Sequence, residues 1–307
     1  MYEAHYGLSA RPFSMRPDPT YLYLAGKHAL ALTLLRYGIA DAGLVTVLTG
    51  EVGVGKTLLV RTLLAGLDRS HSVGMLNNTH LGNHAGAADL MAWVNAAFGL
   101  PHEGRSEAAL HDLFTAHVVA NHAAGKRTLV VVDEAQNLDA TALERLRLLT
   151  NLNVDHHDVL HLLIVGQPEL RRRLQVPGMR QLRQRIGVDY HLPPFGAVET
   201  RDYVRHRLAI AGGSPDLFSD AALAAVQDAT GGLPRAINVL CEFALVYGFA
   251  ADVRAIDAAL VAEVVRDRRN AVGTATSPVA TGGPAAELHA AGDAAVPSAR
   301  GVAVVRP

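Results

Sequence analysis

A glycine-rich loop between a predicted strand and a predicted helix constrains this chain more than any other feature. The apolar run at 44–49 predicts a buried strand, and residues 56–67 have helical spacing. The loop matches G-x-x-x-x-G-K-[ST] and consists of Gly50, Glu51, Val52, Gly53, Val54, Gly55, Lys56 and Thr57. Glycines let successive backbone N–H groups turn toward a phosphate, and the helix N-terminus adds partial positive charge. The sequence therefore predicts a phosphate-binding loop.

The end of this loop carries the side chains expected to hold Mg·ATP. We expect Lys56 to reach the β- and γ-phosphates and the Thr57 hydroxyl to ligate Mg²⁺. Leu58 completes the predicted nucleotide-binding segment. The predicted cofactors are ATP and Mg²⁺.

Two adjacent carboxylates follow the predicted strand at 128–132, which is almost entirely Leu and Val. A nucleotide triphosphatase of this kind needs an acid at a strand tip to hold Mg²⁺, and Asp133 has that expected role. Glu134 is expected to orient and deprotonate the attacking water. A strand that ends in solvated acids is the alternative, which the glycine-rich loop makes the weaker reading.

A polar residue also follows the predicted strand at 160–165. In such a sheet we expect this strand to lie between the strand at 44–49 and the strand at 128–132, which places Gln167 to hydrogen-bond the γ-phosphate or the lytic water. The alternative is that Gln167 is a turn residue before Pro168.

Arginines at two places are candidates for contact with the nucleotide. Arg180, Arg183 and Arg185 precede the predicted strand at 186–192, and one of them is expected to reach the γ-phosphate of a neighbouring copy. Among them we favour Arg185, then Arg183, and a solvated helix face stays the alternative for each. Arg235 begins a later helix and is expected to fold over the nucleotide rather than point only to solvent.

The alternation of strands and helices predicts an α/β fold, with a parallel sheet between two layers of helices. After residue 195 the pattern becomes helical only, which predicts a small all-helical lid. The expected strands are 44–49, 72–77, 128–132, 160–165 and 186–192, and the expected helices include 27–42, 56–67, 85–98, 107–124, 140–152, 197–212, 219–230, 234–250 and 257–268. The predicted divisions are an N-terminal strap at 1–26, a P-loop domain at 27–195, the lid at 196–269 and a disordered tail at 270–307.

Composition restricts the other function classes. Lys and Arg total 28 and Asp and Glu total 29, so net charge gives no general attraction to nucleic acid.

The run 171–173 is three arginines, and we interpret it as a solvated face. The histidine pairs His80/His84 and His157/His161 have i, i+4 spacing, and we expect solvated histidines rather than metal ligands. Neither a signal peptide nor a long apolar run is evident, which predicts a cytoplasmic chain without a membrane span.

Ten short motifs occur in a specific order along the chain. They are 2–8, 12–13, 17–19, 49–57, 133–138, 148–152, 166–170, 183–186, 190–192 and 231–238. Together they resemble the AAA+ ATPases, and within them the ExeA type. This group contains the general secretion pathway A ATPases and ATPases associated with pilus and exosortase or exopolysaccharide systems. The resemblance covers about residues 1–268.

The resemblance implies ATP hydrolysis coupled to assembly of envelope machinery, with homo-oligomers that form on ATP binding. It also implies a membrane or envelope protein as partner and a peripheral position at the inner membrane through that partner. Longer members of the family continue into a membrane span and a peptidoglycan-binding domain. This sequence continues into a low-complexity tail instead, so we expect any cell-wall role to need a partner.

Two other function classes are compatible with the same motifs. One is a DNA-linked AAA+ ATPase, as in transposition or replication initiation, but the basic surface or helix-turn-helix that such proteins need is not evident. The other is a nucleotide-regulated scaffold with little turnover, against which the presence of Glu134 argues.

Overall fold

The computed structural model describes residues 1–16, 18–24, 26–40, 44–77, 87–154 and 157–274. By its internal contacts the chain divides into two units, Met1–Arg268 and Arg269–Pro307. The residues predicted to bind nucleotide all lie in the first unit.

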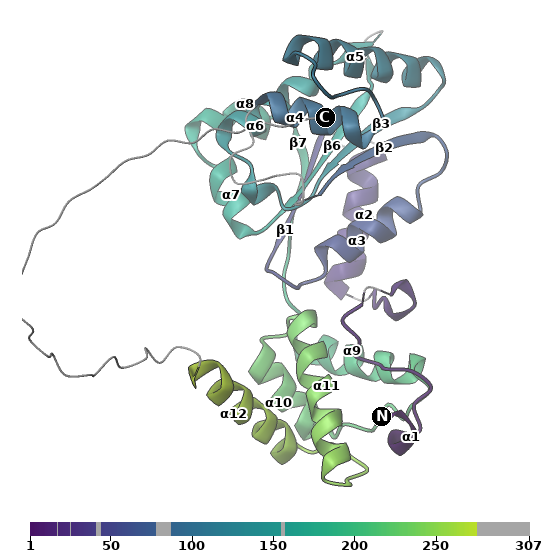
Figure 1. Cartoon of the computed structure of the whole chain (residues 1–307), viewed down its shortest axis with the longest axis vertical. Helices are drawn as coiled ribbons and strands as arrows, with labels where there is room; N and C mark the ends of the chain where they lie inside the picture. The colour runs from purple at the N-terminus through teal and green to yellow at the C-terminus, as the bar shows by residue number, and fades with distance from the viewer. Residues whose placement is uncertain (17, 25, 41–43, 78–86, 155–156, 275–307) are drawn as a thin grey trace, which may run out of the picture. The chain divides into compact units, whose positions relative to one another are not determined.

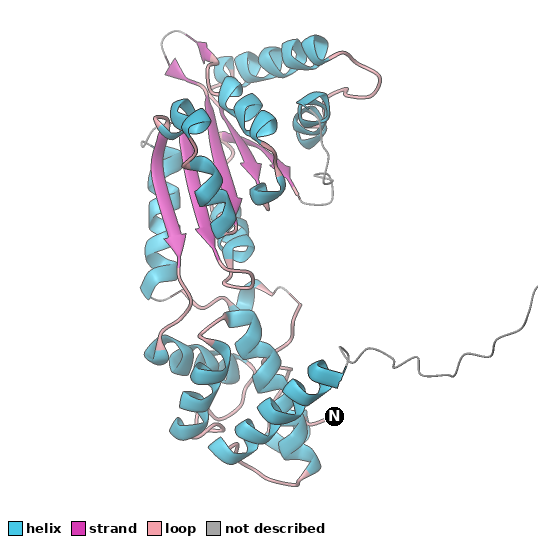
Figure 2. Ribbon diagram, turned by 90° about the vertical axis from the view of Figure 1, so that its left-hand side faces the viewer, coloured by secondary structure: helices cyan, strands magenta, loops and turns pink. Residues whose placement is uncertain are grey.

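Five strands form the predicted parallel sheet. They are β1 (Val45–Gly50), β2 (His71–Leu76), β3 (Arg127–Val132), β6 (Leu160–Gly166) and β7 (Ile186–Leu192). Their order is β2-β3-β6-β1-β7, and all neighbours pair in parallel (Figure 2). The strand before Gln167 therefore lies between the strand before the glycine-rich loop and the strand before Asp133, as predicted. Because the carboxyl ends of parallel strands share one edge, these three polar segments meet there.

Helices cover both faces of the sheet (Figure 1). One face packs against α2 (Gly26–Ala40) and α3 (Lys56–Ala65), and the other against α4 (Ala87–Ala97), α5 (Glu107–Ala123) and α6 (Ala140–Leu149). Alternate strand residues enter two separate cores, with Val130 and Val132 in one and Leu129 and Val131 in the other. This confirms the three-layer α/β fold.

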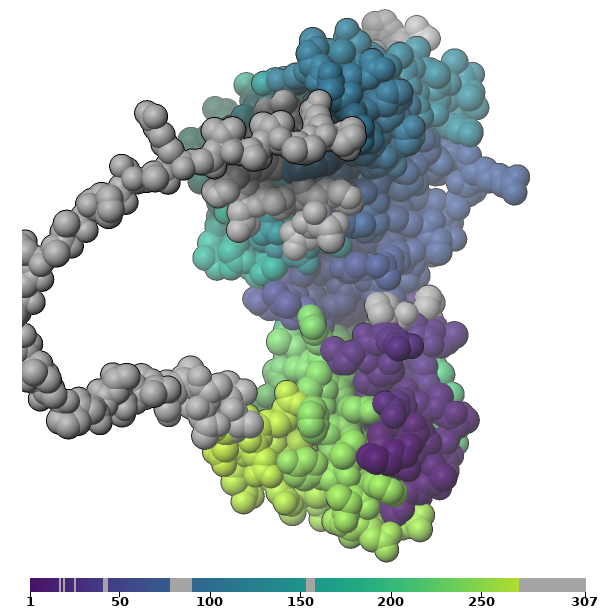
Figure 3. Space-filling model, viewed as in Figure 1, coloured from purple at the N-terminus to yellow at the C-terminus, as the bar shows by residue number. Residues whose placement is uncertain are grey.

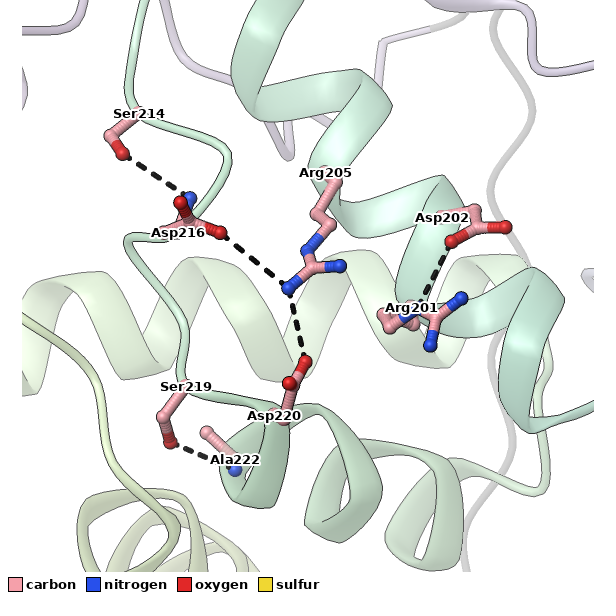
Figure 4. A network of polar contacts seen from close by, with 8 residues as sticks. All are labelled: Arg201, Asp202, Arg205, Ser214, Asp216, Ser219, Asp220 and Ala222. Carbon is pink, nitrogen blue, oxygen red and sulfur yellow. Dashed lines mark hydrogen bonds and ion pairs between the residues drawn. The ribbon is translucent and has the colours of Figure 1, made fainter.

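Four helices follow β7, as predicted. They are α9 (Ala197–Ile210), α10 (Asp220–Thr230), α11 (Pro234–Ala250) and α12 (Ala258–Thr274). Ser219 caps α10, since its hydroxyl accepts the Ala222 N–H at 3.1 Å. Arg205 of α9 bridges Asp216 at 3.5 Å and Asp220 at 3.0 Å, which holds the connection between α9 and α10 (Figure 4).

The N-terminal segment packs on these helices (Figure 3). It contains α1 (Glu3–Tyr6) and a short 3-10 helix, η1 (Pro19–Tyr21). Tyr2, Tyr6 and Phe13 are buried in the core that α9 to α12 form. The Tyr2 hydroxyl donates to Glu242 at 2.7 Å, and the Tyr6 hydroxyl donates to the Leu245 carbonyl at 3.2 Å. The aromatic side chains of this segment therefore attach it to the helical region.

Local structure departs from the predictions at two helix ends and includes one strand pair that was not predicted. Helix α6 ends at Leu149 rather than at residue 152, and the Thr150 hydroxyl donates to the Arg147 carbonyl at 2.6 Å beyond the helix end. The two-residue strands β4 (Asn153–Val154) and β5 (His157–Asp158), which pair with each other, were not predicted. Helix α12 continues to Thr274, so residues 270–274 are not a disordered tail, and residues 275–307 lie outside the described residues.

One of the histidines expected to be solvated is buried. His161 is 8% exposed, and its Nε2 lies 3.0 Å from the Thr46 hydroxyl, because strand β6 is covered on both faces. His80 and His84 lie outside the described residues.

Within the described ranges, none of the helices has both the length and the apolar character that crossing a bilayer requires.

Candidate nucleotide-binding site

The glycine-rich loop joins the carboxyl end of β1 to the first turn of α3, as its pattern predicts. Gly53 and Gly55 have φ of 81° and 107°, which favour glycine. A Cβ on Gly50 would lie 2.7 Å from the Leu192 carbonyl oxygen, and a Cβ on Gly53 would lie 2.7 Å from the Arg235 Cβ. The glycines are therefore required both by backbone conformation and by close neighbours.

The Lys56 ammonium is enclosed by this loop. The side chain is buried, and its Nζ donates to the Gly50 carbonyl at 2.7 Å and to the Glu51 carbonyl at 3.0 Å. Burial lowers the pKa of Lys56, while the nearby carboxylates of Glu134 and Asp133 act in the opposite direction. A buried cation beside a curled backbone is suited to a negatively charged ligand.

Thr57 and Asp133 meet at the base of the loop. The Thr57 hydroxyl donates to Asp133 Oδ2 at 2.9 Å, and the Glu134 N–H donates to the other oxygen of Asp133 at 2.9 Å. Burial raises the pKa of Asp133 despite these hydrogen bonds. A hydroxyl next to a carboxylate provides the hard oxygen ligands that Mg²⁺ prefers, so the residues present fit that ion.

The burial of an ionised Asp133 is expected to cost stability. Because the pKa of Asp133 in the folded state lies above its ordinary value, the protonated carboxyl stabilises the fold at low pH. This stabilisation is lost as pH rises through the pKa of the folded state. Asp133→Asn should therefore raise the free energy of unfolding at pH 7.5 without Mg²⁺, measured by urea denaturation. The exposed Asp112→Asn is the matched control and should leave it unchanged. A less stable Asp133→Asn would contradict the assigned cost of burial.

Glu134 lies beside Asp133 in an uncommon backbone conformation. Its φ of 55° and ψ of 37° are left-handed, which costs about 1–3 kcal/mol for a residue other than glycine. Its Oε2 accepts from Gln167 Nε2 at 3.3 Å and from Gln136 Nε2 at 2.6 Å. Sequence analysis selected Gln167 but not Gln136, whose only signal was its place in the motif at 133–138.

A cavity of about 490 Å³ lies beside the loop and is lined by residues from distant parts of the chain. Loop residues 52–58, Glu134 and Arg235 line it, together with residues of the N-terminal segment. The aromatic side chains on its wall are Tyr21, Tyr23, Phe195 and Tyr203. Sequence analysis predicted the N-terminal segment as a strap and did not place it at this site.

Arg207 attaches this N-terminal wall to the helical region. Its buried guanidinium donates to the Pro12 carbonyl, to the Ser14 carbonyl at 3.4 Å and to the Tyr203 hydroxyl at 2.9 Å. It also lies over the Tyr21 ring, 4.7 Å from the centroid. A buried cation is thus used to fix two backbone carbonyls of the segment that lines the cavity.

Arg235 is brought to the loop from α11. Its backbone N–H donates to the Gly53 carbonyl at 3.2 Å, and its exposed side chain lines the cavity. The position agrees with a residue that contacts the loop from the lid, and the contact with nucleotide stays a prediction.

Arg183 and Arg185 are not brought to the loop of their own chain. The Arg185 carbonyl accepts from the Val45 N–H at the start of β1, whereas the loop follows its end. Six strand residues separate these positions by about 20 Å. The Arg185 guanidinium donates to Thr150 Oγ1 at 2.5 Å and to Asn151, while Arg183 is exposed. Action on a neighbouring copy stays a prediction.

Known proteins are similar to this chain in sequence and in fold. Residues 40–174 match the family model described as AAA domain. The chain is 43% identical over 251 residues to General secretion pathway protein A of Aeromonas hydrophila, which covers 81% of this chain and 45% of that protein. This chain thus spans less than half the length of that relative.

Solved structures with low sequence identity have the same fold. The ORC2 protein of Aeropyrum pernix, solved as ADPNP-ADP complexes, is 22% identical with a TM-score of 0.60, and 84% of this chain and 71% of that chain are covered. A Walker-type ATPase of Pyrococcus abyssi is 14% identical with a TM-score of 0.61, over 86% and 77% of the two chains. These structures show the fold alone; the AAA domain match and the 43% identical relative show that the chain belongs to the AAA+ proteins of the general secretion pathway A (ExeA) type.

Proposed function

We propose that this chain binds Mg·ATP and hydrolyses it to ADP and phosphate. The observation that carries the proposal is the pairing of Thr57 with Asp133 at 2.9 Å, beside the buried Lys56 and the carboxylate of Glu134. Mg²⁺ ligands, a cation for phosphate and a proton acceptor for water are the groups that hydrolysis of a nucleoside triphosphate needs.

Each group has a distinct proposed role. The loop N–H groups and Lys56 bind the triphosphate, with Arg235 approaching it from α11. Thr57 and Asp133 hold Mg²⁺, which when bound neutralises charge on the β- and γ-phosphates. Glu134 accepts a proton from the attacking water, and Gln167 holds the water or the γ-phosphate. The cavity beside the loop, with its aromatic wall, accommodates the nucleoside.

The test is phosphate release from ATP by the purified chain. Release should require Mg²⁺ and stop when EDTA is added, and added Mg²⁺ should restore it. Binding of ATP without release in the presence of Mg²⁺ would favour the scaffold over the hydrolase. Salt-dependent retention of DNA would favour the DNA-linked class instead. The likeness to the ORC2 protein supports the fold alone.

We also propose that turnover energises or regulates assembly of a bacterial secretion, pilus or exopolysaccharide apparatus. The support is the name and identity of the Aeromonas hydrophila relative. The proposed setting is the cytoplasm, where ATP is supplied, with a membrane or envelope protein as partner and an ATP-dependent homo-oligomer as the working form. Pull-down of envelope proteins with the ATP-bound chain, and their absence with the nucleotide-free chain, would test it.

Mixing two inactive variants should reveal whether Arg185 acts on a neighbouring copy. Arg185→Ala keeps its own loop, and Lys56→Ala keeps Arg185, so a mixed interface contains one complete site. Phosphate release by the mixture should exceed the summed release by the two variants measured separately. Arg183→Ala, two residues earlier in the chain, replaces Arg185→Ala in a parallel mixture for comparison. Because Arg185 also bonds Thr150 and Asn151, thermal midpoints of the variants must be matched first. No gain on mixing would contradict the assignment.

A further inference from the structure

The carboxamide of Gln136 lies between the two residues predicted to act on the lytic water. Gln136 belongs to the 3-10 turn η2 (Ala135–Asn137), which follows the two acids. Its Nε2 donates to Glu134 Oε2 at 2.6 Å, and its Oε1 accepts the backbone N–H of Gln167 at 3.0 Å. One side chain thus links the end of β3 to the end of β6.

The orientation of this amide is determined by its partners. A backbone N–H can only donate, so the side facing Gln167 must be the oxygen, and the nitrogen must face the Glu134 carboxylate. The arrangement therefore provides an obligatory N–H donor to that carboxylate.

Gly166 lies next to the amide of Gln136. A Cβ on Gly166 would lie 3.1 Å from Gln136 Oε1 and 2.7 Å from Leu170 Cδ2. A side chain at the last residue of β6 would therefore press on Leu170 and on the amide oxygen of Gln136. The absence of a side chain at Gly166 leaves space for the amide of Gln136 beside the Gln167 N–H.

Both amide donors meet the same oxygen of Glu134. Gln136 and Gln167 donate to Oε2, and among the described residues no hydrogen bond to Oε1 is formed. Two donors on one oxygen restrict rotation of the carboxylate and keep the other oxygen available to accept a proton. Orientation of this kind affects the chemical step more than nucleotide binding.

We propose that Gln136 is a positioning residue that ties the orientation of the Glu134 carboxylate to the backbone of Gln167. The acid that accepts the proton and the amide that faces the γ-phosphate then shift together rather than separately. This inference rests on the proposed hydrolysis of ATP.

Two substitutions at this position break the link between Glu134 and Gln167. Gln136→Met has similar length and forms neither hydrogen bond, and Gln136→Asn carries the same amide on a stem one carbon shorter, which cannot reach both partners. Each should lower kcat about tenfold, the effect of one hydrogen bond to a charged group. KM, the ATP dissociation constant from calorimetry and the thermal midpoint should stay within about twofold or a few degrees of wild type.

The matched control is Gln181→Met on the helix α8 (Arg180–Arg183), an exposed glutamine that should leave kcat unchanged. Wild-type kcat in Gln136→Met would overturn the proposal, because the Glu134 carboxylate would then be oriented without the amide. Wild-type kcat in Gln136→Asn would overturn it as well, because the link to Gln167 would then not be needed. Glu134→Gln run in parallel separates the two hypotheses, since full activity in that variant would instead refute the hydrolytic role of Glu134.

Discussion

Lys56→Ala is expected to weaken ATP binding by about 100-fold or more. The variant removes a buried ammonium group that the loop encloses, and a charge-assisted hydrogen bond contributes about 1.5–3 kcal/mol. Since each 1.4 kcal/mol is a factor of about ten, loss of contacts to two phosphates gives the stated range. Calorimetry with ATP and Mg²⁺ measures the effect.

The control for this variant is Lys126→Ala, which removes an exposed lysine and should leave affinity unchanged. Because burial of the Lys56 charge is itself costly, the variant should fold at least as well as wild type. An unchanged dissociation constant for ATP would remove the basis for assigning the phosphates to this loop.

Glu134→Gln is expected to abolish most turnover while ATP binding is retained. Glutamine has the same shape, and its carbonyl oxygen can still accept from Gln136 and Gln167, but it cannot take a proton from water. General base catalysis contributes about 100- to 10,000-fold, so phosphate release should fall by that factor. The dissociation constant for ATP should change by less than about threefold, a difference under 1 kcal/mol.

The same variant should show whether ATP drives assembly. With hydrolysis blocked, light scattering after size exclusion should detect an ATP-bound oligomer that wild type forms only transiently. Glu103→Gln, an exposed acid, is the control and should behave as wild type. Turnover at the wild-type rate in Glu134→Gln would mean that another group activates the water.

The features that were predicted well depend on residues that lie close together in the sequence. Strands such as β3 are short runs of Val and Leu between helical patterns, and the glycine-rich loop has a fixed spacing that fits only a strand-to-helix junction. The position of β6 between β1 and β3 was also predicted, whereas the places of β2 and β7 at the edges of the sheet were not.

The features that were missed depend on contacts between distant residues. Gln136 stands in a recognisable motif, yet nothing local indicates that its amide reaches Gln167, which is 31 residues away. His161 looks like a surface histidine in the sequence, and only the packing of β6 buries it. The N-terminal segment was predicted as a strap, but its place beside the glycine-rich loop depends on Arg207, which lies 195 residues beyond Pro12.

The docking of the N-terminal segment has a consequence for the order in which this protein folds on the ribosome. Tyr2 hydrogen-bonds Glu242 across 240 residues, so the N-terminal segment is synthesised well before the helix that it packs on. The sheet and its helices are complete by residue 192 and can form before that contact exists. Contacts of such high sequence separation form slowly and leave apolar surface exposed in the interval. The aromatic side chains of this segment therefore stay without their partners until α11 has been synthesised, and closure of the cavity wall follows formation of the sheet.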